Sequence, residues 1–556
     1  MPPEPPGARH PAPPRPDGDA AVTARIEVKL AIDPAAAATT AAALFRHPAV
    51  AAIQRGRVRR ARVVSTYLDT PDGRLASAGI ALRLRRDGSR WLQTVKGPPL
   101  APAGGALHAR GEYEWPIPGP RLDPVRLATT PWRRQLGRAL AGGELAPRFT
   151  TDVERATLKV AFPDGTRAKL TVDVGAIRAA HAAAGRRRRP LRAPVAEVGI
   201  ELESGSTARL FELAAALTAA LPLTVATAGK AARGQALAQG RPDGWHRPVR
   251  AQSVPLAATA RAAAALRAIA VECLHQVAAN AAGLVDDDDP EWIHQMRVGT
   301  RRLRSCLALA ARFVPADRLR PLLAEIRWLA GILGSARDWD VFATETMPAA
   351  AAGSKADPAA AASFRRLAAS VVRRRHDARA AASHAVRSTR FQHLLLAGGA
   401  VCATPDFDLK APAVAGPAAA GPGPRAVDFA RRLLRRRHRR LVRRADACAA
   451  GGPEQRHALR IAAKKLRYAA EFFAPLFDAE RARDYAAALA SLQDVLGRGN
   501  DAATAARLVD ELAAEGDGPA LAALRAWVAA TTAELEPELA RAWKQYAKTQ
   551  RFWRKP

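Results

Sequence analysis

The sequence predicts an α+β protein in which a strand-rich N-terminal half precedes an all-helical C-terminal half. From Arg25 to about Gly240, charged and apolar residues alternate with a period of two, which is typical of strands. From about Pro255 onward the chain is rich in Ala, Leu and Arg at helical spacing and contains no convincing strand. Within this second half one motif recurs at an offset of 163 residues, which indicates a duplicated helical unit.

The 556 residues are enough for about two or three domains. Shifts in Pro, Gly and Ala content mark the boundaries, and the run Arg186–Arg189 is expected at the tip of a charged hairpin. The predicted divisions are a disordered tail at 1–22, a strand domain at 23–240, a linker at 241–256, and a helical domain at 257–545 with halves at about 257–396 and 425–545 joined by a loop at 397–424.

The charge balance predicts an anionic partner. Lys and Arg number 86 against 52 Asp and Glu, a net charge of +34, and such a protein binds nucleic acid, polyphosphate or an anionic membrane surface. Part of the Arg excess is compositional, because high Ala and Arg usage is typical of a GC-rich bacterial genome. Aromatic residues make up only 5%, and no helix-turn-helix or zinc finger is evident, which argues against nucleic acid.

The remaining composition points to the cytoplasm. No apolar run approaches the ~20 residues of a transmembrane helix, so no membrane partner is expected. The N-terminus lacks the pattern of a secretory signal. The four Cys residues are scattered and form no CxxC pair, which fits a reducing compartment and gives no zinc site. The sequence gives no indication of an oligomeric state.

Each strand of the N-terminal half has one charged face and one apolar face, and two architectures fit this pattern. One is a half-buried sheet with its polar face in water. The other is a barrel with an ionic interior and an apolar exterior covered by helices, such as the stretch 207–221. In that interior, Arg and Lys would hold phosphate oxygens while carboxylates hold Mg²⁺ or Mn²⁺.

Several motifs follow one another in this half. They are Ser65-Thr66-Tyr67-Leu68-Asp69-Thr70, Ile80-Ala81-Leu82-Arg83-Leu84-Arg85, Thr94-Val95-Lys96-Gly97, Arg110-Gly111-Glu112-Tyr113-Glu114, Glu154-Arg155, Asp173, and Lys230 with Arg233-Gly234. The series resembles the CYTH domain, the fold of triphosphate tunnel metalloenzymes, over about residues 23–240. The resemblance implies an eight-stranded antiparallel β tunnel, in a family that hydrolyses inorganic triphosphate, thiamine triphosphate or RNA 5′-triphosphates, or cyclises ATP.

The resemblance also implies Mg²⁺ or Mn²⁺ as cofactor and a role for individual residues. The implied catalytic residues are Glu27, Lys29, Arg83, Arg85 and Lys96. The further implied phosphate-binding residues are Arg110, Arg155 and Lys230. The implied metal-side carboxylates are Glu27, Glu112, Glu114, Asp173, Glu197 and Glu201.

The chain departs from the family pattern at two positions. The family's opening Glu-x-Glu-x-Lys is replaced by Arg25-Ile26-Glu27-Val28-Lys29, and Gly199 stands where the late acidic strand usually has a third Glu. Each change removes a candidate metal ligand, and Arg25 adds a positive charge. Both are expected to weaken catalysis.

The repeated motif of the helical half is a cationic helix. His294, Arg297, Arg301 and Arg304 fall within roughly an 80° arc of an α-helix, and His457, Arg460, Lys464, Lys465 and Arg467 belong to the second copy. Such a stripe is either solvated or neutralised by an anion, and the planar fork of Arg suits phosphate. Downstream, Leu333-Gly334 with Arg337-Asp338 is echoed by Leu496-Gly497 with Asn500-Asp501.

These repeats resemble the CHAD domain, an all-helical fold of two pseudo-symmetric bundles that is often fused behind CYTH. The match covers about 257–545 and implies binding of inorganic polyphosphate in a basic groove by His294, Arg297, Arg301, Arg304, His457, Arg460, Lys464, Lys465 and Arg467. Asp338 and Asp501 are expected to cap helices or to orient these bases. The Arg-rich stretch 425–444 is either a solvated amphipathic helix or an extension of the polyanion path.

Three functions compete. The first is an inorganic triphosphatase, weakened by Arg25 and Gly199, that hydrolyses triphosphate or short polyphosphate while the helical domain binds the polymer. The second is a non-catalytic protein that binds polyphosphate and is targeted to its granules. The third, a nucleic-acid binder, rests on the net charge alone.

Overall fold

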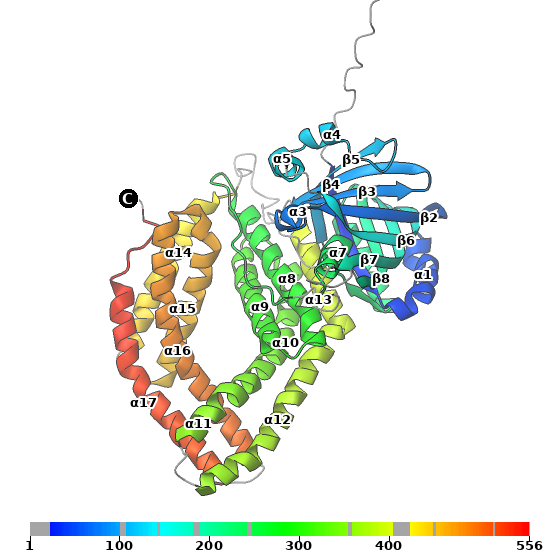
Figure 1. Cartoon of the computed structure of the whole chain (residues 1–556). Helices are drawn as coiled ribbons and strands as arrows, with labels where there is room; N and C mark the ends of the chain where they lie inside the picture. Colours follow the sequence, from blue (N-terminus) through cyan, green and yellow to red (C-terminus); the bar gives the residue numbers. More distant parts are fainter. Residues whose placement is uncertain are drawn as a thin grey trace, which may run out of the picture.

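The computed structural model describes residues 23–99, 107–141, 145–181, 189–241, 247–353, 358–403, 423–448, 452–514 and 518–554. Figure 1 shows an N-terminal sheet domain beside a larger helical domain whose two halves stand next to each other. The predicted tail at 1–22 and the predicted hairpin tip at 186–188 lie outside the described residues.

The sheet closes into an eight-stranded antiparallel tunnel. The strand order is β5-β4-β3-β2-β6-β7-β8-β1-β9, and the additional pairing of β5 with β1 joins the two ends of the eight-stranded part. The short β9 adds to the outer side of this ring by pairing with β1. The strands are β1 (Thr23–Ile32), β2 (Gln54–Asp69), β3 (Ala81–Asp87), β4 (Arg90–Pro99), β5 (Leu107–Ile117), β6 (Ala146–Ala161), β7 (Arg167–His181), β8 (Arg189–Ser204) and β9 (Leu223–Val225).

Helices cover parts of the tunnel exterior. The predicted cover at 207–221 is confirmed as α6, which buries Leu210, Phe211 and Leu217 together with the outward side chains Val28 and Leu30 of β1. The described helices of this domain are η1 (Pro34–Ala36), α1 (Ala37–Arg46), α2 (Pro48–Ala51), α3 (Arg74–Ser77), α4 (Pro124–Ala128), α5 (Arg133–Ala141), α6 (Ala208–Ala220) and α7 (Lys230–Ala238).

The alternation on β1 explains why the sheet closes. Val28 and Leu30 have no exposed surface and lie in the apolar cluster under α6, whereas Glu27 and Lys29 line a cavity on the opposite face. Closing the sheet surrounds the charged face with other charged strands, so that the ions neutralise one another. Of the two architectures that fit the sequence, the tunnel is therefore confirmed and the open half-buried sheet is wrong.

The helical domain is built from two copies of one unit. α9 (Pro290–Ala310) and α15 (Pro453–Phe473) each have 21 residues, and both begin at a Pro, 163 residues apart. The next long helix begins at Ala316 in the first copy and at Ala479 in the second, again 163 residues apart. Pro is favoured in the first turn because the amide that it lacks has no partner there. The predicted duplication is thus confirmed at the level of helix boundaries.

The halves meet at both ends. One apolar cluster joins α8, α9 and α10 to α14, α15 and α16, and a second joins Trp339, Phe342 and Phe364 to Leu508 and Leu521. The remaining elements of this domain are α8 (Ala262–Asp286), α10 (Ala316–Val341), the π-helical turn η2 (Phe342–Thr346), α11 (Met347–Gly353), α12 (Pro358–Arg387), α13 (Thr389–Ala403), α14 (Ala426–Cys448), η3 (Ala474–Leu476), α16 (Ala479–Ala513) and α17 (Pro519–Ala547).

The break predicted at 397–424 begins too early. α13 continues to Ala403, because Leu394, Leu395 and Leu396 are buried on it and the Gly pair that suggested a loop is packed. A side chain at Gly399 would collide with the ring of Phe211, so glycine permits α13 to approach α6. Residues 404–422 lie outside the described part.

The two domains are in direct contact. Leu396 of α13 belongs to the apolar cluster under α6, and the Gln392 Oε1 accepts a hydrogen bond of 2.8 Å from the backbone N–H of Val225 in β9. The segment 247–256, predicted as linker, contains no helix or strand but is bonded to α8. Asn280 exchanges hydrogen bonds with the backbone of Val249, and Glu272 accepts one from Gln252 N–H.

One helix among the described residues is long and apolar enough to cross a membrane by length and composition alone. It is α8, a candidate that the sequence reading did not identify. In this structure 72% of its most apolar window is buried inside the protein, as is typical of a core helix.

Candidate functional site

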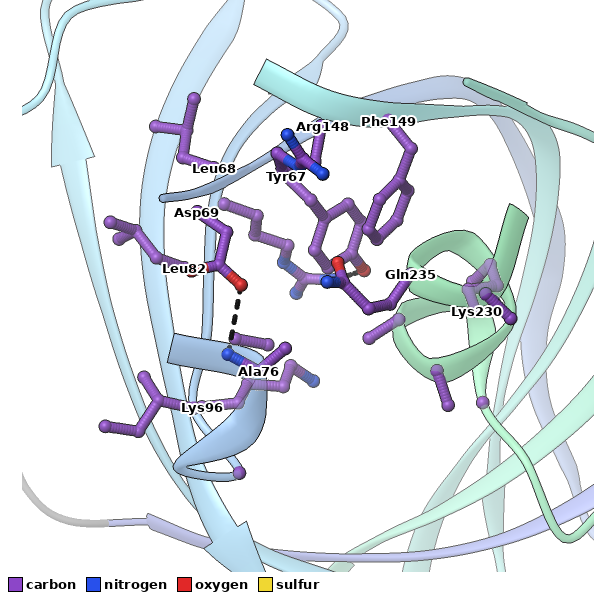
Figure 2. A pocket seen from close by; sticks show the side chains of 18 of the residues that line it. Tyr67, Leu68, Asp69, Ala76, Leu82, Lys96, Arg148, Phe149, Lys230 and Gln235 are labelled. Atoms are coloured by element: carbon purple, nitrogen blue, oxygen red, sulfur yellow. Dashed lines mark hydrogen bonds between the residues drawn. The ribbon is translucent and has the colours of Figure 1, made fainter. Parts of the chain in front are cut away.

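The tunnel encloses a cavity of about 500 Å³ whose wall carries a large excess of positive charge. Nine Lys and Arg residues line it, against five Asp and Glu residues. Figure 2 shows the labelled side chains converging on this space from β2, β3, β4, β6 and α7. The lining includes the predicted Glu27, Lys29, Arg83, Arg85, Lys96, Arg110, Glu112, Arg155, Asp173, Glu197 and Lys230.

One group of charges lies on β3, β4 and β5. Arg83 and Lys96 contact Glu112 at 3.3 and 3.0 Å, and Arg85 contacts Glu114 at 2.7 Å. The register explains this grouping, because Lys96 lies directly opposite Glu112 across β4 and β5. Arg83 and Arg85 are both nearly fully buried. Burial, with the neighbouring Arg83, lowers the pKa of Arg85 to about 10, so an added anion would be stabilised here.

A second group lies on β1, β6, β7, β8 and α7. Asp173 accepts two hydrogen bonds of 2.7 Å from Arg155 and one of 2.7 Å from Lys230. Lys230 also donates to Glu197, and Lys29 lies 3.4 Å from both Glu27 and Glu197. Although burial alone would raise it, the pKa of Asp173 is held well below its usual range by Lys230 and Arg155.

α7 contributes Lys230 because it lies against β6. A side chain at Gly234 would collide with the ring of Phe149, so only glycine permits this approach. Lys230 is the first residue of the helix and is nearly fully buried between Asp173 and Glu197. The Lys230…Gly234 motif thus has a structural reason for its spacing: Gly234 lets α7 pack against Phe149, and α7 carries Lys230 into the cavity.

Several guanidinium donors in the cavity have no protein partner. The Nε atoms of Arg83, Arg85 and Arg148 are buried and unbonded within the described part of the chain. Arg110 lines the same space and forms no ion pair with a described carboxylate, and burial lowers its pKa. Buried donors without partners are costly, and an oxyanion in the cavity would relieve that cost.

The wall also includes residues to which the sequence analysis gave no role in the site, among them Tyr67, Arg148, Phe149, Gln235 and Arg241. Tyr67 and Phe149 are stacked with ring centroids 4.4 Å apart, and Arg83 donates a hydrogen bond of 3.5 Å to the Tyr67 hydroxyl. Figure 2 shows this pair beside Arg148 and next to Gln235 of α7. Alternation on β6 would not have identified Arg148, because seven residues, an odd step, separate it from Arg155; the register shift between β2 and β6 next to Arg148 interrupts the alternation.

Asp69 lines the cavity, but its carboxylate is bonded to backbone N–H groups. Its carboxylate accepts hydrogen bonds from the N–H groups of Thr70, Leu75 and Ala76 at 2.8 to 3.0 Å. The last of these bonds is drawn in Figure 2. This residue therefore fixes the short helix α3 at the rim of the cavity, which is a structural role.

The six predicted metal-side carboxylates are distributed around the tunnel. No group of three or more His, Cys, Asp or Glu side chains converges on one point within the described ranges. Two cross-strand pairs do form: Glu27 lies opposite Glu201, and Asp173 lies opposite Glu197. Mg²⁺ is commonly held by one or two carboxylates plus substrate phosphates, and Glu27 is the member of the first pair that lines the cavity. Glu201 does not line it and is ion-paired with Lys169 at 2.9 Å, so it could join Glu27 in holding an ion only by giving up that contact.

The two departures from the family pattern have different structural settings. The side chain of Glu27 lies over Gly199, where a Cβ would collide with its Oε1, so the missing carboxylate leaves space that Glu27 fills. For Arg25 the structure gives the backbone only, which lies opposite Arg110 on β5. Its side chain is outside the described part.

A second cavity, of about 980 Å³, lies between the two halves of the helical domain. Both copies of the repeated motif contribute cations to its wall, as the pseudo-symmetry predicts. The predicted residues that line it are His294, Arg297, Arg301, Arg460, Lys464 and Arg467. Arg302, Arg337 and Arg483 were missed and also line it.

Like charges face one another in this second cavity. Burial, followed by repulsion from Arg301 and Arg460, lowers the pKa of Lys464 to about 6. Burial and Arg301 lower the pKa of Arg460 to about 10, and its Nε is buried without a partner in the described structure. The pKa of His294 is lowered by burial and by Arg337. The wall is therefore preorganised for an anion.

Three residues predicted for the same groove lie elsewhere: Arg304, His457 and Lys465 are exposed and do not line the cavity. Asp338 and Asp501 lie inside α10 and α16, so the helix-capping role is wrong for both. Asp338 orients bases instead, since it contacts Arg297 and Arg507, each at 3.3 Å.

Comparison with known proteins follows the same division. A family model for the CYTH domain matches residues 24–234, and one for the CHAD domain matches residues 268–510. An inorganic triphosphatase from Haemophilus influenzae is 29% identical over 178 residues, which cover 31% of this chain and 45% of that protein. The match thus spans less than half the length of this relative.

Two solved structures are also similar. The CHAD domain from the plant Ricinus communis has 33% identity and a TM-score of 0.48, with 55% of this chain and 98% of that chain covered. PptA from Streptomyces chartreusis has 21% identity and a TM-score of 0.37, with 52% and 96% covered.

A closed antiparallel tunnel with a cationic interior, followed by a duplicated helical unit with a basic cavity, defines a two-domain protein in which each domain encloses a cation-lined space. The matches give these domains their names. The chain consists of a CYTH domain followed by a CHAD domain.

Proposed function

We propose that the CYTH tunnel hydrolyses inorganic triphosphate or short polyphosphate with Mg²⁺ or Mn²⁺, and that the CHAD domain binds inorganic polyphosphate in the cytoplasm. The observation that carries the first part is the cavity wall, where nine cations face five carboxylates and three buried Arg Nε donors have no hydrogen-bond partner among the described residues. A compact polyanion is the ligand that such a wall stabilises most. The triphosphatase relative from Haemophilus influenzae supports the same class of reaction.

The chain's own residues would bind and orient the substrate. In this proposal two groups of cavity-lining cations hold phosphate oxygens. The first is Arg83, Arg85 and Lys96, and the second is Arg155, Lys230 and Lys29. Fixing both ends of a triphosphate aligns the bond to be broken with an attacking water, which is most of what phosphoryl transfer requires. A divalent ion held at Glu27 and Glu201 would supply charge neutralisation at the phosphate oxygens.

The first test is phosphate release from tripolyphosphate by the purified protein with Mg²⁺ or Mn²⁺. We expect Glu27→Ala to lower the rate by about 100-fold or more, because Glu27 is the tunnel carboxylate that faces both Lys29 and Glu201. Glu154→Ala is the matched control, since this carboxylate is exposed on β6 and bonded to Arg60 outside the cavity. Equal loss in both variants would contradict the assignment of the reaction to the tunnel.

A non-catalytic role is the second candidate, and one observation favours it. Asp173 is fully engaged by Arg155 and Lys230, and Gly199 supplies no carboxylate, so few acidic groups are free to hold a metal ion. Under this alternative both domains bind polyphosphate and the protein associates with polyphosphate granules. The same assay separates the two: no phosphate release, with salt-sensitive binding of long-chain polyphosphate, supports the alternative.

Binding in the CHAD cavity is expected to depend on pH through Lys464. Its pKa of about 6 leaves it mostly neutral at pH 8, and a bound polyanion favours the charged form, so binding takes up a proton. The groups that face it are Arg297, Arg301, Arg460 and Asp501. We expect affinity for polyphosphate to fall on the order of 10-fold from pH 6 to pH 8 at constant ionic strength.

Lys464→Arg is the control for this pH dependence, because Arg stays charged throughout the range. The variant should bind with a flatter pH profile, which isothermal titration calorimetry in two buffers of different ionisation enthalpy would measure. His294 contributes mainly below its ordinary pKa, since burial and Arg337 lower its own pKa. Identical slopes in wild type and Lys464→Arg would contradict the prediction.

A further inference from the structure

Three of the nine cations that line the tunnel cavity have no carboxylate partner among the described residues. Each of the other six contacts an Asp or Glu within 3.4 Å; they are Lys29, Arg83, Arg85, Lys96, Arg155 and Lys230. The remaining three are Arg110, Arg148 and Arg241. An added anion would therefore find its uncompensated partners at these three positions.

Arg148 is turned into the cavity by a bulge in β6. The register with β2 passes from Tyr67–Phe149 to Leu68–Pro147, so Arg148 has no residue directly opposite it on β2. Neighbouring residues of a regular strand point to opposite faces, yet Arg148 and Phe149 both line the cavity. Bulges re-aim side chains in this way and are common next to active sites. Figure 2 shows Arg148 beside Tyr67 and Phe149.

The same bulge lies at the rim of the cavity. Arg148 is the third residue of β6, and the first, Ala146, lies opposite Asp69 of β2. Asp69 fixes α3 at this rim through its hydrogen bonds to backbone N–H groups. Arg155, which donates to Asp173, lies seven residues further along β6, about 23 Å of extended strand. Arg148 is therefore separate from the inner group of ion pairs.

Arg241 reaches the rim from α7. Its backbone N–H donates a hydrogen bond of 3.0 Å to the carbonyl of Ala236, which folds the chain back at the end of this helix. This end of α7 meets α3, because a Cβ on Gly73, directly before α3, would lie 3.0 Å from the Gln235 Nε2. Lys230 at the other end of α7 belongs to the inner group. The helix thus brings one cation to each part of the cavity.

The rim offers cations rather than a surface for a nucleobase. Arg241 donates a hydrogen bond to the Gln239 side chain, and the Arg148 Nε is buried without a partner in the described structure. Tyr67 and Phe149 are stacked on each other with ring centroids 4.4 Å apart and are nearly fully buried, so little ring surface remains for a base. A buried guanidinium donor without a partner is best satisfied by an oxyanion.

We propose that Arg148 and Arg241, called the rim pair below, bind a fourth phosphate, so that the tunnel prefers linear chains longer than triphosphate. The inference rests on the proposed hydrolysis of triphosphate or short polyphosphate in the tunnel and narrows its substrate. A triphosphate occupies the six paired cations, whereas a chain of four or more phosphates also reaches the rim. Each planar guanidinium can donate two parallel hydrogen bonds to the added phosphate.

The test measures kcat/KM of the full chain for tripolyphosphate, tetrapolyphosphate and ATP with Mg²⁺ or Mn²⁺. The rim variant is Arg148→Gln with Arg241→Gln. The matched control is Arg59→Gln with Lys159→Gln, which removes the same charge from exposed residues of β2 and β6 that do not line the cavity. We expect wild type to prefer tetrapolyphosphate. In the rim variant the ratio of kcat/KM for tetrapolyphosphate to that for tripolyphosphate should fall about 10-fold, and the control should keep the wild-type ratio.

Several outcomes would overturn the proposal. Equal losses for the two phosphates would mean that the rim pair only attracts anions to the tunnel, and an equal fall of the ratio in the control would make it an effect of net charge. A loss confined to ATP would assign the rim to the organic part of a nucleotide. Hydrolysis of tripolyphosphate without any preference for the longer chain would leave the proposed function intact and remove this inference, whereas hydrolysis of neither phosphate would contradict both.

A second rim variant separates charge from geometry. Arg148→Lys with Arg241→Lys keeps the charge but loses the planar fork, so it should lower the ratio by less than the Gln variant does. It also replaces the Gln variant if that protein melts at a much lower temperature than wild type. A ratio equal to that of wild type in both rim variants would contradict the proposal.

Discussion

Replacing Arg83 and Arg85 together with Ala is expected to reduce tripolyphosphate hydrolysis by at least about 10³-fold. The two side chains come from one strand, are nearly fully buried and each have an unbonded Nε in the cavity. They are held in place by Glu112 and Glu114, so their donors are oriented before any substrate enters. Preorganised donors of this kind stabilise charge that develops at phosphate oxygens without any cost of reorganisation at the moment of reaction.

Arg86→Ala on the same strand is the matched control. Arg86 is exposed and donates its Nε–H to the carbonyl of Gly88, so it lies on the outer face of β3. The control should keep the wild-type rate, and both variants should keep the melting temperature within a few degrees. A double variant that retains turnover would place the reaction outside the tunnel. A double variant that loses only affinity would make these arginines binding groups without a role in the chemical step.

The alternation of charged and apolar residues was sufficient to predict short strands that keep this alternation throughout, such as β1 and β3. It did not predict the full extent of β2. The first half of that strand, from Gln54 to Arg62, is mostly exposed Arg and has no apolar face, so its strand structure depends on pairing with β6 rather than on burial. Local sequence carries no signal for such a segment.

The candidate site divides in a similar way. The residues Lys29, Arg83, Arg85 and Lys96 were predictable because each belongs to a motif, and the structure gathers them in one cavity. Arg148 has no motif around it and lies at the register shift between β2 and β6, which alternation cannot predict. In the helical half, an 80° stripe on one helix could not show that Arg301 and Arg304 face different spaces, because that division depends on where α14 packs. The packing of neighbouring helices decides which side of such a stripe is enclosed, and the periodicity of one helix does not show where its neighbours lie.

Arg302 should contribute more to stability than any other cation of the repeated motif. It lies between the two stripe positions Arg301 and Arg304 but is buried, and it contacts Glu272 of α8 and Glu471 of α15, each at 3.1 Å. We expect Arg302→Ala to lower the free energy of unfolding by about 3–5 kcal/mol, because Glu272 would remain buried without a charged partner. Urea denaturation followed by circular dichroism would measure the change.

The physical reason predicts a specific rescue. If the loss of unfolding free energy arises from the unpaired charge of Glu272, the double variant Arg302→Met with Glu272→Gln should recover more than half of it. Gln removes the charge but keeps an acceptor for the Gln252 N–H. Arg304→Ala, two residues away and exposed, should stay within about 0.5 kcal/mol of wild type. Absence of rescue would mean that the loss of stability comes from the contacts that the Arg302 side chain makes, not from the unpaired charge of Glu272. Those contacts are the ion pair with Glu471 of the other half and the packing of the guanidinium on the Phe472 ring, 5.2 Å from the ring centroid. The same stretch of α9 would then combine two tasks at adjacent positions: Arg301 lines the cavity between the halves, and Arg302 attaches the halves to each other.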